Sequence, residues 1–236
     1  LGESLLGPSA QHWFGTDIQG RDIFCRVLVG TQITLTVGLA AVAISLTVGG
    51  LLGSIAGYKG GKVDNLLMRL TEILLSVPNL LLVVLIQAIL GKATVWSISL
   101  VIGLTSWTSI AKVVRTEVRQ LRGSEYILAA KCMGGSFFYI LRRHLAPNFL
   151  SSIMFMVVMN VRSAMIAEST LSFMGIGLPL EVISWGSMLS LAEKALLTNA
   201  WWIIVIPGVF LVVTLLCMTN IGHDLRRRAN HRHSNL

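Results

Sequence analysis

Two ionisable side chains, Arg162 and Glu168, stand within or near the end of a stretch whose other residues are almost all apolar or small. A charged group inside a bilayer is costly, and it therefore indicates a functional site by default. Counted along a helix from Pro147, Arg162 lies about 22 Å away, in the outer half of a bilayer. Arg162 either faces the interior of the protein, where it would attract an anionic group, or it pairs with Glu168 or reaches the outer interface.

The other reactive residue types form no catalytic or metal-binding constellation. His223, His231 and His233 belong to a basic terminal stretch, which is poorly placed for a pathway, and the three cysteines are single and lack metal-site spacing. No span carries the ladder of His, Cys or carboxylate ligands that would pass a bare Ni²⁺ ion, and no HExxH or P-loop motif is present. We therefore expect no catalytic residue, no metal site and no cofactor bound by this chain.

The elements that carry these residues are membrane-spanning helices. Of the 236 residues, 54% are hydrophobic and only 13% are charged, and the mean hydropathy is +0.74. Soluble domains carry about 25% charged residues, and only helices or closed barrels satisfy their backbone in lipid. Alternating strands are absent, so the sequence predicts an all-α membrane protein with five visible spans. These spans are expected at residues 33–58, 66–90, 93–111, 147–170 and 201–221.

The basic residues indicate how the chain is oriented. Fourteen of the 19 Lys and Arg residues fall on alternate connections and on the C-terminal stretch, and such residues stay cytoplasmic. Residues 1–32 are then an external segment with a short amphipathic helix, and residues 223–236 form a basic cytosolic tail. Because five spans with a cytosolic C-terminus place Leu1 outside, we expect one further span upstream, six in all. The expected location is the cytoplasmic membrane of a bacterium or archaeon, as a multi-pass protein in contact with lipid.

Two prolines are expected to bend the spans that contain them. Pro78 follows Ser76-Val77 in the second span, and Pro207 precedes Gly208 in the last. Proline removes a backbone hydrogen bond and kinks a helix. Both are candidate gate positions, although an ordinary packing distortion explains them equally well. The transmembrane domain as a whole is expected at residues 33–222.

A half-polar stretch, SEYILAAKCMGGSFFYILRRHLAPN, lies within the charged segment 112–146 between the third and fourth spans. Ser124 is expected to cap a helix, with Glu125 favourably placed in its first turn. Gly134 and Gly135 end this helix, Ser136 caps a second helix, and Pro147 opens the fourth span. The sequence thus predicts a helix–turn–helix on the cytosolic face, with a tip kept slim by Ala129, Ala130 and Gly134.

This stretch resembles the EAA loop of ABC-importer permeases, the coupling helix that docks on the ATPase subunit. Three other segments agree with the dipeptide, oligopeptide and nickel permeases: HWFGTDIQGRDIFCRVLVG, GYKGGKVDNLLMR and ESTLSFMGIGLPLEVISWGSML. The matches run in order from about residue 8 to 225. The chain departs from the family's usual LDPR ending after Arg226-Arg227, which leaves the role of the tail in doubt.

The resemblance implies a type I ABC-importer permease fold and a set of partners. These are a second homologous permease subunit in a heterodimer, two ATPase subunits that bind ATP and Mg²⁺, and an extracytoplasmic substrate-binding protein. No nucleic-acid partner is expected. The coupling residues carried over from the EAA pattern are Glu125, Ala129, Ala130, Gly134 and Pro147, and the candidate pathway or gate residues are Arg162, Glu168, Pro78 and Pro207.

The resemblance leaves the substrate open. Di- or oligopeptides are favoured by the number of such systems, and import of nickel or a metal chelate is the alternative. An ion-coupled secondary transporter would be expected to show mid-membrane acids or inverted repeats, and neither is found. A membrane-embedded enzyme would need a nucleophile and base or clustered ligands within the spans, and these are also absent from the sequence.

Overall fold

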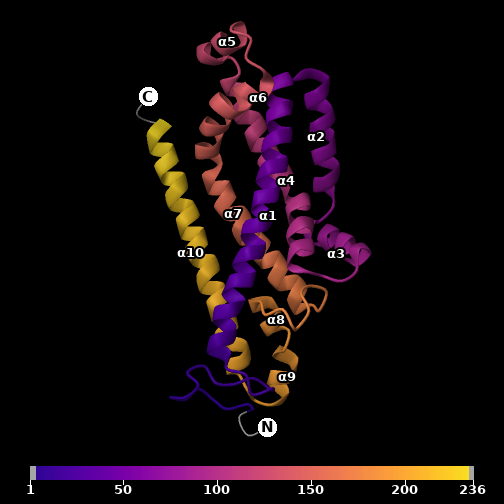
Figure 1. Ribbon diagram of the computed structural model, residues 1–236, viewed down its shortest axis with the longest axis vertical. Coiled ribbons are helices and arrows are strands. Elements are labelled where there is room, and N and C mark those ends of the chain that lie inside the picture. Colours follow the sequence, from indigo (N-terminus) through magenta and orange to yellow (C-terminus); the bar gives the residue numbers. More distant parts are fainter. Residues whose placement is uncertain (1–3, 234–236) are drawn as a thin grey trace.

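The computed structural model describes residues 4–233, with the backbone alone at residues 192–193 and 229–233. The molecule is an elongated bundle of helices whose two ends carry different structures (Figure 1). One end holds two short helices and the C-terminus, and the other holds the N-terminal loop and two further short helices. The helices are α1 Ile23–Lys59, α2 Gly61–Ser76, α3 Asn79–Leu90, α4 Val95–Leu121, α5 Glu125–Cys132, α6 Phe137–Ile140, α7 Ala146–Phe173, α8 Trp185–Leu189, α9 Ala192–Leu197 and α10 Trp202–His233, with a π-helical turn at Leu141–Leu145.

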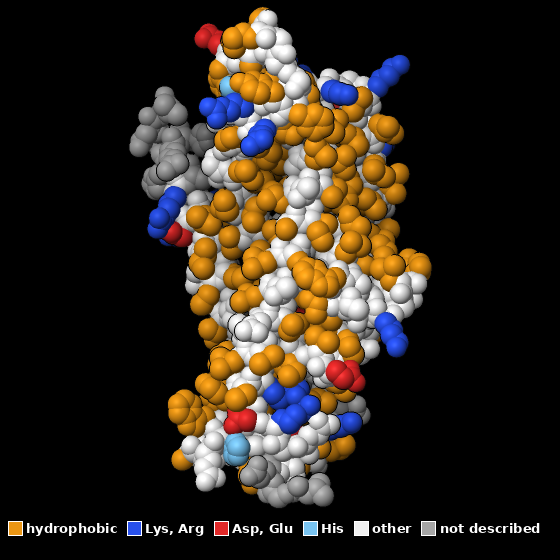
Figure 2. Space-filling model, in the orientation of Figure 1, with side chains coloured by type: hydrophobic (Ala, Val, Ile, Leu, Met, Phe, Trp, Pro, Cys, Tyr) orange, Lys and Arg blue, Asp and Glu red, His pale blue; other side chains and the backbone are white. Residues whose placement is uncertain are grey.

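The long helices are apolar enough to cross a membrane. Four of them qualify by length and composition, and the bent pair α2 and α3 makes up to five. Apolar side chains cover the middle of the molecule, whereas charged side chains gather towards its two ends (Figure 2). The expected all-α membrane fold is therefore confirmed, with four unbroken candidate spans and a fifth if the bent pair α2 and α3 is one span.

The first span packs most extensively against α4, and its small residues explain why. A Cβ atom on Gly49, Gly53 or Gly57 would lie within 2.7 Å of a carbonyl oxygen of α4. Such spacing, one small residue every four, lets two helix backbones approach closely in lipid. Ser45 adds a buried hydrogen bond from its Oγ to the carbonyl oxygen of Gly103, at 2.8 Å.

The second span is broken where a kink was expected. The axes of α2 and α3 differ by 88°, and Val77 between them is extended, with φ −96° and ψ 132°. The residue before a proline is pushed out of the helical region, and Pro78 itself lies at the N-cap of α3. The break is thus complete, and the chain changes direction at an exposed Pro78.

Several helices extend past the limits that hydropathy suggested. The first begins at Ile23, so residues 23–32 continue into the first span and do not form a separate amphipathic helix. Helix α4, which contains most of the expected third span, also includes Lys112 to Leu121. These residues were expected to belong to the coupling loop. Hydropathy marks where a helix leaves lipid, but helix-forming charged residues prolong it into water. The last helix likewise continues to His233, and residues 234–236 of the expected tail lie outside the described residues.

The expected surface helix before Pro147 is also continuous with the fourth span. Residues Phe137–Phe173 form one helical stretch, in which the N–H of Ala146 donates to the carbonyl oxygen of Leu141, five residues back. Because Pro147 has no N–H, the series of backbone hydrogen bonds along the helix is interrupted there. Next to this interruption, the side-chain amide of Asn148 donates from Nδ2 to the carbonyl oxygen of His144, at 2.6 Å.

Candidate functional site

The predicted coupling residues lie on a small protruding unit, residues 124–140, which we call the elbow. It consists of α5, a turn and α6, and it forms one tip of the molecule (Figure 1). Glu125 is the first residue of α5 and is exposed. Ser124 occupies the N-cap position, but its hydroxyl donates backwards to the carbonyl oxygen of Leu121 at 2.6 Å, so no side-chain cap forms.

The two alanines of the elbow have different environments. Ala129 is exposed, whereas Ala130 is buried together with Ile127 in an apolar cluster that includes residues of α4 and α7. On a helix of 3.6 residues per turn, Ile127 and Ala130 lie on one face. Ala130 therefore anchors the elbow to the bundle, and the small side chain of Ala129 keeps the outer surface of the elbow flat.

The two glycines of the turn are also required for different reasons. Gly134 has φ +81° and a Cβ there would contact nothing within 4 Å. Gly135 has the opposite constraint, because a Cβ there would lie 2.7 Å from the carbonyl oxygen of Ala130. Their N–H groups donate to the carbonyl oxygens of Lys131 and Ala130, both at 2.9 Å. Gly134 is therefore an open, exposed point on a fixed turn.

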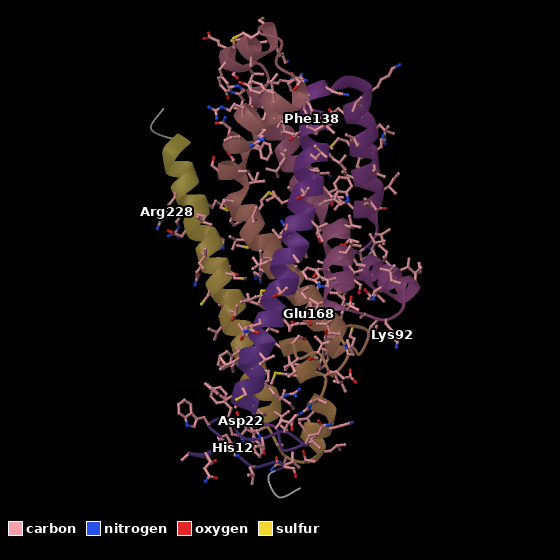
Figure 3. All side chains as sticks on the ribbon, viewed as in Figure 1. His12, Asp22, Lys92, Phe138, Glu168 and Arg228 are labelled. Carbon is pink, nitrogen blue, oxygen red and sulfur yellow. The ribbon has the colours of Figure 1, made fainter. Side chains whose placement is uncertain are left out.

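Exposed aromatic and apolar side chains surround this turn, and the sequence reasoning missed them. Met133 is 82% exposed and Phe138 is 69% exposed, and Figure 3 shows Phe138 at the end of the bundle that the elbow forms. Tyr139 is also exposed and lines a shallow surface depression together with Met133 and Gly134. The signal was present in the sequence, since FFY follows the two glycines after a single residue, Ser136.

A ring contact joins the elbow to the first span. The rings of Tyr58 and Phe137 have centroids 5.2 Å apart, and the ammonium of Lys131 lies 4.5 Å from the centre of the Tyr58 ring. Such cation–π contacts are worth about 0.5–1 kcal/mol at exposed sites. The elbow is thus held to the ends of α1 and α4 by apolar and ring contacts.

An ion pair beneath the elbow was not predicted. Both carboxylate oxygens of Asp64, in the first turn of α2, accept hydrogen bonds from the guanidinium of Arg115 on α4. A bidentate pair of this kind fixes geometry as well as charge. Arg122, two turns further along α4, donates from Nη1 to the carbonyl oxygen of Gly57 at 3.2 Å. Together these contacts fix the angle between α1, α2 and the end of α4.

At the opposite end, Glu168 organises the segment 174–191, which we call the outer hairpin. Its carboxylate is fully buried, and Oε1 accepts hydrogen bonds from Ser172 Oγ at 2.8 Å and from Ser184 Oγ at 2.7 Å. Ser169 Oγ lies at a longer 3.4 Å from Oε2. Among the described residues, no cation pairs with this carboxylate. Glu168 is deep in the bundle (Figure 3), where it joins α7 to the N-terminus of α8.

The outer hairpin is fixed further by Trp185, which is 1% exposed. Its backbone N–H donates to Thr34 Oγ1 at 3.2 Å, and its indole Nε1 donates to the carbonyl oxygen of Val27 at 3.1 Å. A Cβ on Gly186 would lie 2.6 Å from the Cα of Ser169. The hairpin therefore rests on α1 and α7 through close backbone approach and buried hydrogen bonds.

Arg162 does not join the Glu168 network. The two residues are six positions apart on α7, so they point about 120° away from each other around the helix. Within the described residues, the buried Nε of Arg162 has no hydrogen-bond partner. The expected alternative of an Arg162–Glu168 pair is therefore wrong for this structure. Pro207, the other candidate on a span, is buried inside α10.

Comparison with known proteins agrees with this architecture. The family described as the binding-protein-dependent transport system inner membrane component matches residues 49–230. The dipeptide transport system permease protein DppC of Bacillus subtilis (strain 168) is 38% identical over 96% of this chain and 70% of its own length. The oligopeptide transport system permease protein OppC of the same organism is 38% identical over 93% of this chain and 71% of its own length.

A solved structure shares the fold. The chain resembles an inward-facing conformation of the MetNI methionine ABC transporter with a TM-score of 0.68, over 87% of this chain and 97% of that one, at 15% identity. This likeness supports the expected type I permease fold. The family match covers most of the chain, and the structure has four helices, or five with the bent pair, that are long and apolar enough to cross a membrane. The chain belongs to the family of binding-protein-dependent transport system inner membrane components, the non-catalytic permease subunits of ABC transporters.

Proposed function

We propose that this chain forms half of the translocation pathway of an ATP-driven importer of di- or oligopeptides. The observation that carries the proposal is the 38% identity, over 96% of the chain, to a dipeptide transport permease. The second half of the pathway is a homologous permease subunit, two ATPase subunits supply the energy from ATP and Mg²⁺, and an extracytoplasmic binding protein delivers the peptide.

The elbow is the contact point for an ATPase subunit in this proposal. Three features support the role: a protruding position, a positive-φ glycine with open space around it, and a cluster of exposed aromatic and apolar side chains. Apolar and aromatic groups are typical of the buried centre of an interface. Glu125, exposed at the start of α5, adds a charge that selects the docking register more than it adds affinity.

The elbow and the C-terminus lie at the same end of the molecule (Figure 1). The basic residues Arg226, Arg227 and Arg228 follow the last span there, and they are exposed. Under the positive-inside rule this end is cytosolic, so the outer hairpin and the N-terminal loop face the binding protein. In this orientation the ATPase and the binding protein act on opposite ends of the same rigid bundle.

Arg162 is the pathway residue that the geometry supports best. It lies on the face of α7 that carries Phe155 and Met159, and these two residues pack against Gly222 of α10. The last helix has no charged residue between Trp202 and His223, so it offers Arg162 no counter-ion. Arg162→Ala is expected to lower peptide uptake with assembly unchanged, and Arg162→Lys is expected to retain part of it. Wild-type uptake by the alanine variant would remove Arg162 from the pathway.

The proposal is tested with the complete transporter in lipid vesicles. Labelled dipeptide is expected to accumulate only when ATP, both permease subunits, the ATPases and the binding protein are present. Uptake of nickel or a nickel chelate with no uptake of peptide would assign the alternative cargo. Peptide uptake by this chain without any ATPase would overturn the proposal entirely.

A further inference from the structure

A small pocket lies between the N-terminal loop and the outer hairpin, at the end of the molecule opposite the elbow. It encloses about 310 Å³, at the small end of the range for ligand sites. Its charged lining residues are Asp17, Arg21, Arg26, Glu181 and Lys194. The side chains that the structure describes there therefore bring three positive charges and two negative ones.

Arg26 is the residue that marks this pocket as a binding site. Its side chain is only 7% exposed, and its Nε lies 3.7 Å from Asp17 Oδ2. Its Nη1 is buried and has no hydrogen-bond partner within the described part of the chain. A buried guanidinium donor without a partner is costly. An acceptor that enters the pocket would remove this cost.

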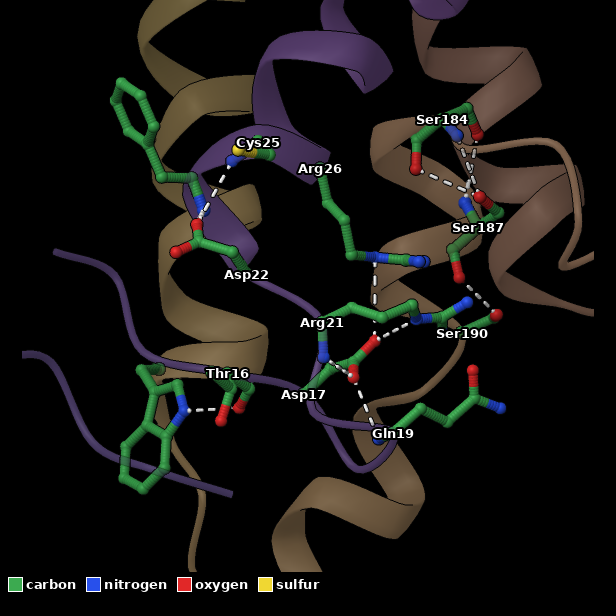
Figure 4. Close-up of polar contacts among 12 residues, drawn as sticks. Thr16, Asp17, Gln19, Arg21, Asp22, Cys25, Arg26, Ser184, Ser187 and Ser190 are labelled. Atoms are coloured by element: carbon green, nitrogen blue, oxygen red, sulfur yellow. Dashed lines mark hydrogen bonds and ion pairs between the residues drawn. The ribbon is translucent and has the colours of Figure 1, made fainter. Parts of the chain in front are cut away.

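Asp17 is already engaged by other donors. Its Oδ1 accepts from the backbone N–H groups of Gln19, at 2.8 Å, and Arg21, at 2.9 Å. Its Oδ2 accepts from Arg21 Nε at 2.8 Å. Figure 4 shows both guanidinium groups extending from Asp17 towards α8 and its serines. One carboxylate is thus shared between two arginines, and Lys194 adds a third cation to the same pocket.

The apolar part of the lining determines what kind of anion fits. Ile18, Leu180 and Leu191 line the same space as the cations. A ligand that satisfies both features carries one carboxylate next to a small apolar group, as the last residue of a peptide does. Arginine binds carboxylates through a planar fork of donors, which suits this role.

We propose that this pocket receives the C-terminal carboxylate of a peptide as the binding protein releases it. The proposal rests on the proposed function, because it concerns the peptide cargo of the same transporter. The guanidinium of Arg26 turns towards the pocket to donate to the carboxylate, Arg21 and Lys194 supply further positive charge, and Glu181 opposes the entry of ligands with more than one negative charge. A single residue fits the volume, so the pocket recognises the end of a peptide and is indifferent to its length.

The test compares trialanine with trialanine amide in the complete vesicle system. The ratio of their uptake rates is measured for the natural chain, Arg26→Gln and Lys194→Gln, always with the same binding protein, so that selection by the binding protein cancels. We expect Arg26→Gln to lower the acid-to-amide ratio about tenfold, the effect of one lost hydrogen bond to a charged group. Lys194→Gln, at an exposed position, is expected to lower it about threefold through the Coulomb term alone.

The control is Arg69→Gln, which removes an arginine that is 82% exposed and lies on α2, a helix that does not line the pocket. Its acid-to-amide ratio is expected to equal that of the natural chain. Assembly is checked by size-exclusion chromatography, and if Arg26→Gln does not assemble, Lys194→Gln decides the question. An unchanged ratio in the assembled variant overturns the proposal, although ATP-dependent peptide uptake, and hence the proposed function, would still stand.

Two other sources of an anion give different results. If an acidic side chain of the binding protein occupies the pocket, Arg26→Gln weakens binding of that protein to the vesicles and reduces acid and amide uptake equally. If a lipid phosphate occupies it, the effect of the variant appears in phosphatidylglycerol vesicles and disappears in phosphatidylcholine vesicles, again equally for both peptides. Either result would overturn the assignment to the peptide carboxylate.

Discussion

The two ends of this molecule are held together by different forces. The elbow is attached through apolar side chains such as Ile127 and Ala130 and leaves its aromatic residues exposed. The outer hairpin is attached through a fully buried carboxylate, Glu168, and the serine hydroxyls that donate to it. The contrast indicates that the elbow has contact surface available for another protein, whereas the hairpin uses its polar groups to fix its own position.

The difference has a consequence for substitutions at the two ends. Removing a buried acceptor leaves its donors unsatisfied, so it affects stability. Removing an exposed side chain of the elbow weakens the binding of a partner protein, and it leaves the stability of the chain itself nearly unchanged. Four substitutions test this contrast.

Glu168→Ala is expected to have the largest effect on stability. The change leaves the hydroxyls of Ser172 and Ser184 without their acceptor and opens a cavity, which together cost about 3 kcal/mol. Thermal unfolding in lipid nanodiscs and limited proteolysis of residues 174–191 measure it. Glu168→Gln is the matched control, because its amide oxygen can still accept from both serines, and it is expected to lose less than half as much. Equal losses in the two variants would show that the negative charge, not the hydrogen bonding, holds the hairpin.

Asp64→Ala is expected to cost about 2 kcal/mol, because it leaves the guanidinium of Arg115 without its bidentate partner. The loss should appear in the same unfolding assay, together with faster proteolysis in the turn between α1 and α2. Replacing both residues, with Asp64→Ala and Arg115→Met, should recover part of the loss, since no unpaired charge then remains. A double variant that is as unstable as the sum of the single ones would show that the two residues act independently.

Gly134→Asp is expected to lower peptide uptake about tenfold or more. It should cost only about 1 kcal/mol of stability, because a non-glycine residue at positive φ is strained by about that amount. The ATPase activity of the assembled transporter should then no longer respond to the binding protein. Gly91→Asp is the matched control, since Gly91 has φ +80° and equally open surroundings but lies away from the elbow. If both variants transport normally, the elbow does not couple to the ATPase through this glycine.

The apolar and glycine-dependent features of the molecule could be predicted from the sequence, because they depend on local residue type. Uncharged runs indicated the four long apolar helices and the region of the bent pair α2 and α3, and Gly134 adopts the positive φ expected of a helix-ending glycine. The extent of the break at Pro78 could not be predicted. A proline disrupts a helix locally, but whether the chain then bends slightly or turns by 88° depends on what the two segments pack against.

The polar contacts between elements could not be predicted, because each joins residues that are distant in the chain. Asp64 and Arg115 are 51 positions apart, and Ser184 is 16 positions from Glu168. The sequence indicated only that each charge needed a partner. For Glu168 it suggested Arg162, the nearest opposite charge, whereas the structure uses the hydroxyl groups of Ser172 on the same helix and of Ser184 in the outer hairpin.

Asp22→Ala gives the smallest expected effect, and it tests whether the outer end depends on polar groups beyond the hairpin. Asp22 caps α1, with Oδ1 accepting from the N–H groups of Phe24 at 2.8 Å and Cys25 at 3.2 Å, and its Oδ2 lies 2.8 Å from His12 Nδ1. Burial alone would raise the pKa of Asp22, but the His12 contact and the two backbone N–H groups outweigh it and hold this pKa below its usual value. Loss of such a cap costs about 1 kcal/mol.

The sign of the pH dependence follows from the lowered pKa. A carboxylate whose folded-state pKa is depressed stabilises the protein above the pKa of the unfolded chain, about 3.9, and this contribution is lost as the pH falls through the folded-state value. Unfolding of Asp22→Ala should therefore differ from the natural chain at pH 7 and converge with it in strong acid. Asp22→Asn keeps a capping oxygen and should lose only the charge-dependent part. A difference for Asp22→Ala that stayed constant down to pH 3 would mean that the ionised form adds nothing, and that Asp22 acts only through the hydrogen bonds of its cap.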